Sequence, residues 1–164
     1  MEMIRGDYTK GNNMTSVQGT GAQTSRATAT FIVPCFREQA TVARTLRALD
    51  QLAQAKSAYE WEIIVVNDGS DDDTLGEATR TAAELATTVR ILSHRRNAGL
   101  GAGMRTGISA SRGDMVVAVD CDLSYSIDDI SRLIDTWTET HPHIVIASPY
   151  MEGGQSVQVP RPLA

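Results

Sequence analysis

The chain has 164 residues, of which 41% are hydrophobic and 21% are charged, a composition typical of one soluble globular domain. These proportions exclude wholesale disorder, collagen and coiled coil. The net charge of −5 provides no global basic field and therefore argues against a nucleic-acid partner. Two cysteines are too few for a disulfide scaffold or a four-cysteine zinc site. No stretch reaches the roughly 18 to 20 apolar residues of a membrane helix.

The first 27 residues differ in composition from the rest. Residues 1–27 are rich in Gly, Thr, Ser and Asn and lack the apolar core of a signal peptide. Such a stretch buries too little surface to offset its ordering entropy, so we expect a disordered tail. Together with the few cysteines, this composition favours a cytoplasmic protein.

From residue 28 onward, apolar runs alternate with helical patterns. Strands are predicted at 28–33, 61–66, 89–92, 115–119 and 143–148. The first helix is predicted from the apolar stripe Val42, Leu46, Leu49 and Leu52, and the second, behind an N-cap at Ser70, from Leu75, Ala78, Ala82 and Leu85. A third helix is expected over roughly 100–111, and a fourth, capped by Ser126, carries the stripe Ile130, Leu133 and Trp137. Continuous Val and Ile runs indicate strands buried on both faces, as in a parallel α/β sheet.

Polar residues follow the predicted strands. They lie at 34–38, 67–70, 94–97 and 120–122, and the carboxyl ends of parallel strands meet at one edge of the sheet, where ligands bind. Three of these segments contribute carboxylates and one contributes Arg95 and Arg96. The mixture suits a divalent cation and a phosphorylated ligand. Each arginine has two open interpretations, a phosphate contact or a solvated side chain.

Two aspartates are the sharpest local signal. Asp120 and Asp122 lie two residues apart just past a buried strand, where both could face one Mg²⁺ or Mn²⁺ ion. The alternative is a solvated turn. Asp68 likewise has two interpretations: a turn aspartate that bonds its own backbone, or an acceptor for a nucleobase or ribose. The acidic clusters 71–73 and 128–129 are expected to stabilise the first turns of helices.

The glycine-rich segment 99–103 fails as a dinucleotide motif, because its third glycine would fall on Met104. We expect instead that the glycines let a helix start close to the sheet, with amide donors near an anion. Cys35 and Cys121 both follow strands, so small buried thiols that lie near each other are expected.

Five collinear segments together carry a resemblance: FIVPCFRE, EIIVVNDGSDDDT, RNAGLGAGMRTGI, SRGDMVVAVDCDLS and IVIASPY. Over residues 29 to about 154 the chain resembles family-2 glycosyltransferases with the GT-A fold, and most of all the dolichyl- and polyprenyl-phosphate sugar synthases, such as dolichol-phosphate mannose synthase. The resemblance implies a Rossmann-like nucleotide-sugar-binding domain over 28–154 that is incomplete at its C-terminus, with an extended segment at 155–164. We expect a mostly parallel sheet in the order 3-2-1-4, right-handed crossovers, and the fifth strand beyond the fourth.

The resemblance also implies residue roles. Pro34, Phe36 and Glu38 would contact the nucleotide, Val66 and Asp68 its base, and Asp120, Cys121 and Asp122 the diphosphate and the Mg²⁺ or Mn²⁺ ion, with Asp120 and Asp122 as the metal ligands. The donor would be a GDP- or UDP-sugar, transferred with inversion to a lipid-phosphate acceptor at the membrane surface. No catalytic base is identified.

Four positions depart from the synthase pattern: Phe36 replaces Tyr, Arg37 replaces Asn, Ser124 replaces Gln and Pro149 replaces Arg. The alternatives are a non-catalytic nucleotide-sugar-binding module and, against the glycine spacing, a Rossmann oxidoreductase.

Overall fold

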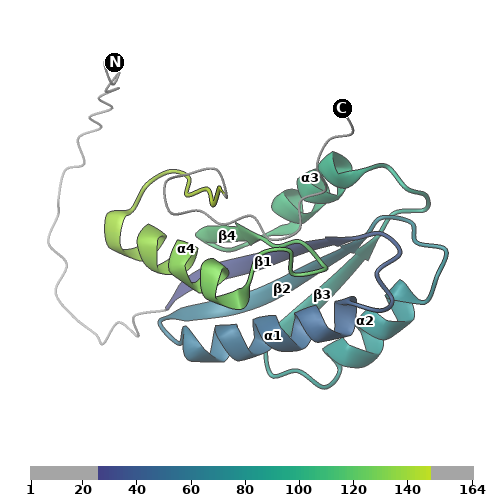
Figure 1. Cartoon of the computed structure of the whole chain (residues 1–164), viewed down its shortest axis with the longest axis horizontal. Coiled ribbons are helices and arrows are strands. Elements are labelled where there is room, and N and C mark those ends of the chain that lie inside the picture. Colours follow the sequence, from purple (N-terminus) through teal and green to yellow (C-terminus); the bar gives the residue numbers. More distant parts are fainter. Residues whose placement is uncertain (1–25, 149–164) are drawn as a thin grey trace, which may run out of the picture.

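The structure is a computed structural model that describes residues 26–148, in which four strands form one parallel sheet (Figure 1). In chain order the elements are β1 (Ala27–Cys35), α1 (Val42–Ala55), β2 (Tyr59–Asn67), α2 (Thr74–Ala82), β3 (Thr88–Ser93), α3 (Leu100–Ala110), β4 (Met115–Ala118) and α4 (Ile127–Thr140). The sheet order β3-β2-β1-β4 confirms the order 3-2-1-4 predicted for these strands, and every pairing is parallel.

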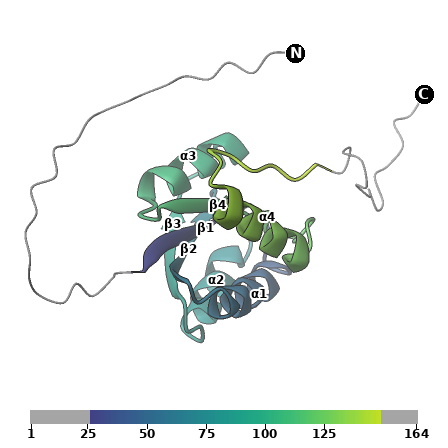
Figure 2. The ribbon, with the colours of Figure 1, turned by 90° about the vertical axis from the view of Figure 1, so that its left-hand side faces the viewer.

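Helices cover both faces of the sheet. On one face α1 and α2 pack side by side and α4 lies next to α1, whereas α3 packs on β1 and β2 from the opposite face (Figures 1 and 2). Within the described residues, no helix is long and apolar enough to cross a membrane.

The two faces of β1 divide the core. Phe31 and Val33 point toward α1 and are fully buried, and the Phe31 ring stacks on Trp61 at 4.3 Å between centroids. Ile32 and Pro34 point the other way, toward α3. Because α1 covers one face of β1 and α3 the other, the strand is buried on both faces, as the continuous apolar run predicts, and β2 and β4 pair with its two edges.

Two predicted helices are confirmed in detail. The whole predicted stripe of α1 is buried: Val42, Leu46, Leu49 and Leu52. Ser126 caps α4 in a capping box with Asp129, and Asp128 and Asp129 lie in its first turn.

The predicted start of α2 at Ser70 is wrong. The helix begins at Thr74 with Asp73 as its N-cap, so residues 71–73 precede the first turn rather than forming it. Asp72 accepts from the Thr74 backbone N–H at 3.1 Å, while the Ser70 hydroxyl accepts from the Arg37 N–H at 3.0 Å. Ser70 is therefore engaged with the neighbouring loop, and the aspartate next to the helix supplies the acceptor.

The fifth predicted strand is not formed by residues 143–148. In the part of the chain that the structure describes, β4 pairs only with β1, and a groove separates β4 from residues 142–147. The groove keeps residues 143–148 away from the unpaired edge of β4, and Ile144 and Ile146 are 74% and 76% exposed. The predicted segment 155–164, and the predicted tail apart from residues 26 and 27, lie outside the described residues.

The close approach of α3 to the sheet predicts how glycine-to-alanine substitutions in this helix change the stability of the fold. A Cβ added at Gly107 would lie 2.4 Å from Ile32 Cγ2, whereas one at Gly101 would meet only the Arg105 side chain at 3.6 Å. We expect Gly107→Ala to cost about 1–3 kcal/mol by overpacking. Gly101→Ala should stabilise the helix by up to about 1 kcal/mol. Urea denaturation of both variants checks this, and equal midpoints would refute the close packing.

Candidate functional site

Four loops meet at the carboxyl edge of the sheet, as predicted, and we call these loops the rim: 36–41, 68–73, 94–99 and 119–126. Backbone hydrogen bonds connect them directly. The Asp68 N–H donates to the Cys35 carbonyl at 2.8 Å, and the His94 N–H donates to the Asn67 carbonyl at 2.9 Å. The second and third loops are therefore each positioned by the neighbouring strand as well as by their own.

Asp68 is the most highly connected carboxylate of the rim. It is 4% exposed, and its oxygens accept from His94 Nδ1 at 2.5 Å, from the Ala98 N–H at 3.0 and 3.1 Å, and from the Gly99 N–H at 2.7 Å. An ionised carboxylate only accepts, so Nδ1 of His94 donates; in the neutral ring Nε2 then accepts from the Thr106 hydroxyl at 2.8 Å. Burial alone would raise the pKa of Asp68, but the hydrogen bonds from His94, Ala98 and Gly99 outweigh it and lower the pKa.

This role differs from the turn interpretation of Asp68 offered by the sequence. The carboxylate does not bond its own turn, but fastens the loop before α3 to the end of β2. The predicted amide donors at the start of α3 are found near an anion, and the anion is Asp68 itself. A nucleobase contact stays a prediction.

Asp120 and Asp122 project from the last loop of the rim, and both are exposed. In the described residues the Asp120 carboxylate has no hydrogen-bond or ion-pair partner. One oxygen of Asp122 accepts from the backbone N–H and the hydroxyl of Ser124, at 2.9 and 2.6 Å. The hydroxyl bond lowers the pKa of Asp122, so its carboxylate stays ionised.

These two carboxylates have oxygen atoms left over for a cation. Across residues 26–148 no group of three or more His, Cys, Asp or Glu side chains could hold a metal ion. A cation at Asp120 and Asp122 would therefore need further ligands from outside, and Mg²⁺ commonly takes them from phosphate oxygens and water. The residues fit a metal that binds together with a diphosphate.

Cys121 lies between these aspartates but faces the core. Its Sγ is 3.1 Å from Cys35 Sγ, both thiols are buried and free, and the expected proximity is confirmed. The hydrogen bond with Cys121, together with burial, raises the pKa of Cys35. The Cys121 carbonyl accepts from the Thr45 hydroxyl at 2.6 Å, which anchors the loop to α1.

The other predicted nucleotide contacts differ in accessibility. Phe36 is 40% exposed, Pro34 is half-buried, and the Val66 side chain is fully buried beneath the rim. Val66 can therefore act only by positioning its neighbours. Glu38 accepts a hydrogen bond from Thr41, next to the start of α1, which gives its carboxylate a structural contact.

Arg37 brings two loops of the rim together, a contact that the sequence did not reveal. Its guanidinium forms two hydrogen bonds of 2.7 Å with Asp71 and lies 5.2 Å from the centre of the Phe36 ring. This hydrogen bond is the largest cause of the lowered pKa of Asp71. Residue 37 has a positive φ of 59°, which turns its side chain toward the second loop.

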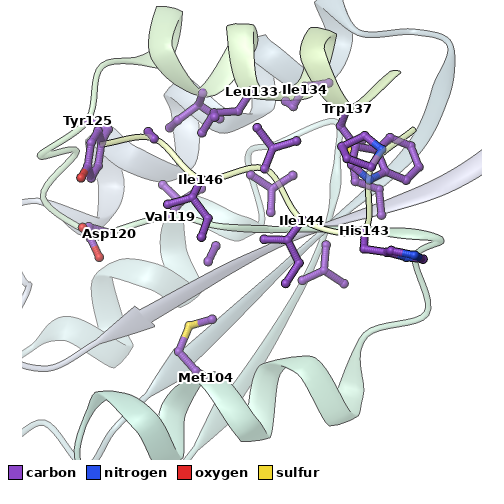
Figure 3. A pocket seen from close by; sticks show the side chains of 18 of the residues that line it. Met104, Val119, Asp120, Tyr125, Leu133, Ile134, Trp137, His143, Ile144 and Ile146 are labelled. Carbon is purple, nitrogen blue, oxygen red and sulfur yellow. The ribbon is translucent and has the colours of Figure 1, made fainter. Parts of the chain in front are cut away.

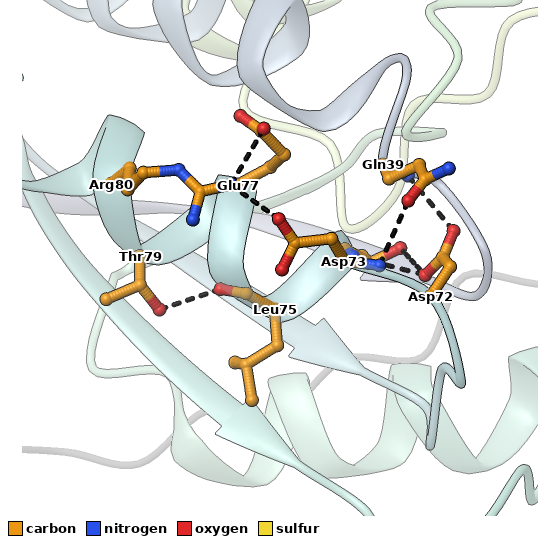
Figure 4. Close-up of polar contacts among 8 residues, drawn as sticks. Gln39, Asp72, Asp73, Leu75, Glu77, Thr79 and Arg80 are labelled. Carbon is orange, nitrogen blue, oxygen red and sulfur yellow. Dashed lines mark hydrogen bonds and ion pairs between the residues drawn. The ribbon is translucent and has the colours of Figure 1, made fainter.

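The remaining aspartates of the acidic cluster make structural contacts, although they precede α2 and do not lie in its first turn as expected (Figure 4). Asp72 bonds Thr74, and Asp73 forms an ion pair with Arg80 at 2.6 Å. The Asp73 N–H donates to the Gln39 side chain at 3.0 Å, which connects the first and second loops.

A groove of about 710 Å³ extends from the rim along β4. Figure 3 shows Met104 on one side, Leu133 and Trp137 on the other, and Asp120 near one end. The lining side chains are largely apolar, so the groove suits an apolar occupant.

Comparison with known proteins identifies related sequences and folds. The model of the family described as Glycosyl transferase family 2 matches residues 30–164. The dolichyl-phosphate beta-glucosyltransferase ALG5C of Trichomonas vaginalis is 35% identical over 108 residues, which are 63% of this chain and 32% of that protein. The dodecaprenyl-phosphate galacturonate synthase of Rhizobium johnstonii is 31% identical over 120 residues, 72% of this chain and 35% of that protein.

Solved structures share the fold. The mannosyltransferase PcManGT from Pyrobaculum calidifontis, in complex with GDP-Man and Mn²⁺, has a TM-score of 0.61 at 21% identity over 71% of this chain and 34% of its own. S. aureus TarS in complex with UDP has a TM-score of 0.54 at 23% identity, over 68% and 33%. The chain thus spans about a third of the length of the relatives it matches.

The Asp68 contacts predict a pH dependence. Because the folded pKa lies below the ordinary value of 3.8, the carboxylate stabilises the fold above that value, and the contribution is lost as the pH falls through the lowered pKa. Asp68→Asn should cost about 1.5–3 kcal/mol near neutral pH, the scale of a charged hydrogen bond. The cost should shrink in acid.

Denaturant titrations from pH 7 down to about pH 3 measure this difference. Glu60→Gln, at an exposed position, is the control and should follow the unaltered chain at every pH. A constant difference between Asp68→Asn and the unaltered chain would contradict an ionised, hydrogen-bonded Asp68.

Proposed function

The chain belongs to glycosyl transferase family 2, and from that premise we propose that residues 28–154 form the donor-binding part of a GT-A glycosyltransferase. The donor is a GDP- or UDP-sugar, and the acceptor is a polyprenyl or dolichyl phosphate. The observation that carries this proposal is the Asp120 carboxylate, which has no partner among residues 26–148 and lies two residues from Asp122 at the carboxyl edge of a parallel sheet.

Asp120 and Asp122 would hold a Mg²⁺ or Mn²⁺ ion that the donor diphosphate shares. Such an ion supplies Lewis-acid neutralisation of charge on the leaving diphosphate. Arg44 supports the site from α1, because its guanidinium donates to the Asp122 carbonyl at 3.0 Å. This contact fixes the backbone of the loop and leaves the carboxylate oxygens available.

The other residues of the rim would bind and orient the donor. Phe36 offers a partly exposed ring at the end of β1. Arg95 and Arg96 are exposed in the rim loop that follows β3, from which one of them would contact a nucleotide phosphate. Asp68 would hold this loop in place. Its carboxylate could also accept a hydrogen bond from the nucleobase.

The proposed acceptor explains why no general base is needed. The oxygen of a lipid phosphate is already an anion and can attack the anomeric carbon directly, on the face opposite the leaving diphosphate, with inversion. The two relatives named for dolichyl- and dodecaprenyl-phosphate chemistry support this choice. We also propose that the protein acts on the cytoplasmic side of a membrane, associated through its acceptor.

Substitutions at the metal pair test the proposal. Asp122→Asn and Asp120→Asn each keep the shape but remove a charge, and should weaken Mn²⁺-dependent binding of GDP or UDP about ten- to a hundredfold. Asp72→Asn is the matched control: it should cost about 0.5–2 kcal/mol of stability through its contact with Thr74, without changing nucleotide affinity.

Calorimetric titration of GDP and UDP, with and without Mn²⁺, makes the measurement. Equal weakening by Asp72→Asn and Asp122→Asn would show that the metal pair is wrongly assigned. Binding without turnover of any GDP- or UDP-sugar on a polyprenyl phosphate would favour the non-catalytic binding module.

A further inference from the structure

One stretch of this acidic chain is strongly basic. Residues 94–113 contain four arginines and no Asp or Glu, although the whole chain has a net charge of −5. The stretch comprises the loop before α3, the whole of α3 and the turn that follows it.

These arginines lack the partners that arginines have elsewhere. Among residues 26–148, ion pairs with carboxylates are formed by Arg37, Arg47, Arg80, Arg90 and Arg132. The arginines of the basic stretch are exposed, and within the same part of the chain none has a carboxylate within 4.0 Å: Arg95, Arg96, Arg105 and Arg112. Their positive charge is therefore not neutralised locally.

Large apolar side chains are exposed among them. Leu100 is 64% exposed and Ile108 is 52% exposed, eight residues apart on α3. Gly103 and Gly107 turn their side of the helix toward Pro34 and Ile32 in the sheet, Leu100 begins the helix ahead of these contacts, and Arg105 lies on the side opposite the glycines. Within the described residues no second helix covers this face, so the outer side of α3 is open (Figure 2).

We propose that this surface docks on an anionic lipid bilayer. The α3 surface consists of Arg95, Arg96, Leu100, Arg105, Ile108 and Arg112. Arginines on a helix attract anionic headgroups, while exposed Leu and Ile side chains insert at the boundary with the acyl chains. A free phosphate would make no use of Leu100 and Ile108.

Nucleic acid fits the same surface less well. Single-stranded nucleic acid is bound by basic grooves that also carry aromatic stacking platforms, and residues 94–113 contain no Phe, Tyr or Trp. The apolar contribution comes from aliphatic side chains, which favour a lipid interface.

Docking through this surface would also orient the rim. Arg95 and Arg96 lie in the loop that Asp68 fastens, so a bilayer in contact with them lies beside the rim. Binding of this surface to a bilayer requires neither the nucleotide-sugar nor a metal ion, and is independent of the proposed transfer reaction.

Vesicle co-sedimentation of the full chain tests the inference. We expect binding to phosphatidylcholine vesicles that contain phosphatidylglycerol, weakened by added salt, and little binding to phosphatidylcholine alone. Arg105→Gln with Arg112→Gln should weaken binding about 25-fold, because each arginine contributes about fivefold. Adding Leu100→Ser and Ile108→Ser to that variant should weaken vesicle binding further, without changing how binding depends on salt.

The matched control is Arg47→Gln with Arg80→Gln, which removes the same charge from α1 and α2 on the other face. It should leave vesicle binding unchanged, and all variants should retain the circular dichroism spectrum of the unaltered chain. Equal loss in the control, equal binding to neutral vesicles, or tighter binding to single-stranded RNA than to anionic vesicles would overturn the proposal. Titration of the same variants with GDP and UDP separates failure of the bilayer proposal from failure of the proposed function, because the bilayer surface and the nucleotide site are measured independently.

Discussion

Three hydrogen-bond donors converge on the buried carboxylate of Asp68, and all three come from a loop 26 to 31 residues further along the chain. A buried charge is costly unless its oxygens are satisfied. The loop before α3 therefore has to close over the end of β2, and it brings the start of α3 with it. Gly69 permits this closure, because any side chain there would collide with the Arg96 backbone at 2.3 Å.

The same constraint connects the two faces of the sheet. His94 bonds both Asp68 and Thr106, so one ring joins β2 to the body of α3. On the other face, the thiols of Cys35 and Cys121 and the bond from Thr45 hold the loop after β4 against α1. The metal pair is thus carried by a short loop whose central residue is buried, with its two carboxylates directed outward. The packing of Cys121 positions these aspartates, and no ion pair within the described residues neutralises their carboxylates.

Local patterns in the sequence were sufficient for most of the fold. The apolar runs predicted the four strands of the described sheet, and the stripe of α1 and the capping box of Ser126 were found as expected. The start of α2 was missed because Ser70 and Asp73 are both good caps, and the choice depends on Arg37 in a different loop. The partners of Asp68 could not be predicted for the same reason: they follow from the closure of a distant loop. The strand at 143–148 failed because an apolar run shows β-propensity but does not show whether the segment reaches the free edge of β4, from which a groove separates it.

The unpaired side of β4 has a consequence for how the protein behaves in solution. β4 has four residues, Val116 is 40% exposed, and within the described chain its outer N–H and C=O groups have no neighbouring strand. An unpaired edge next to an apolar groove can accept an added strand, but an edge of only four residues offers few hydrogen bonds, which limits aggregation between copies. A charged residue at position 116 would act as a further gatekeeper against strand addition.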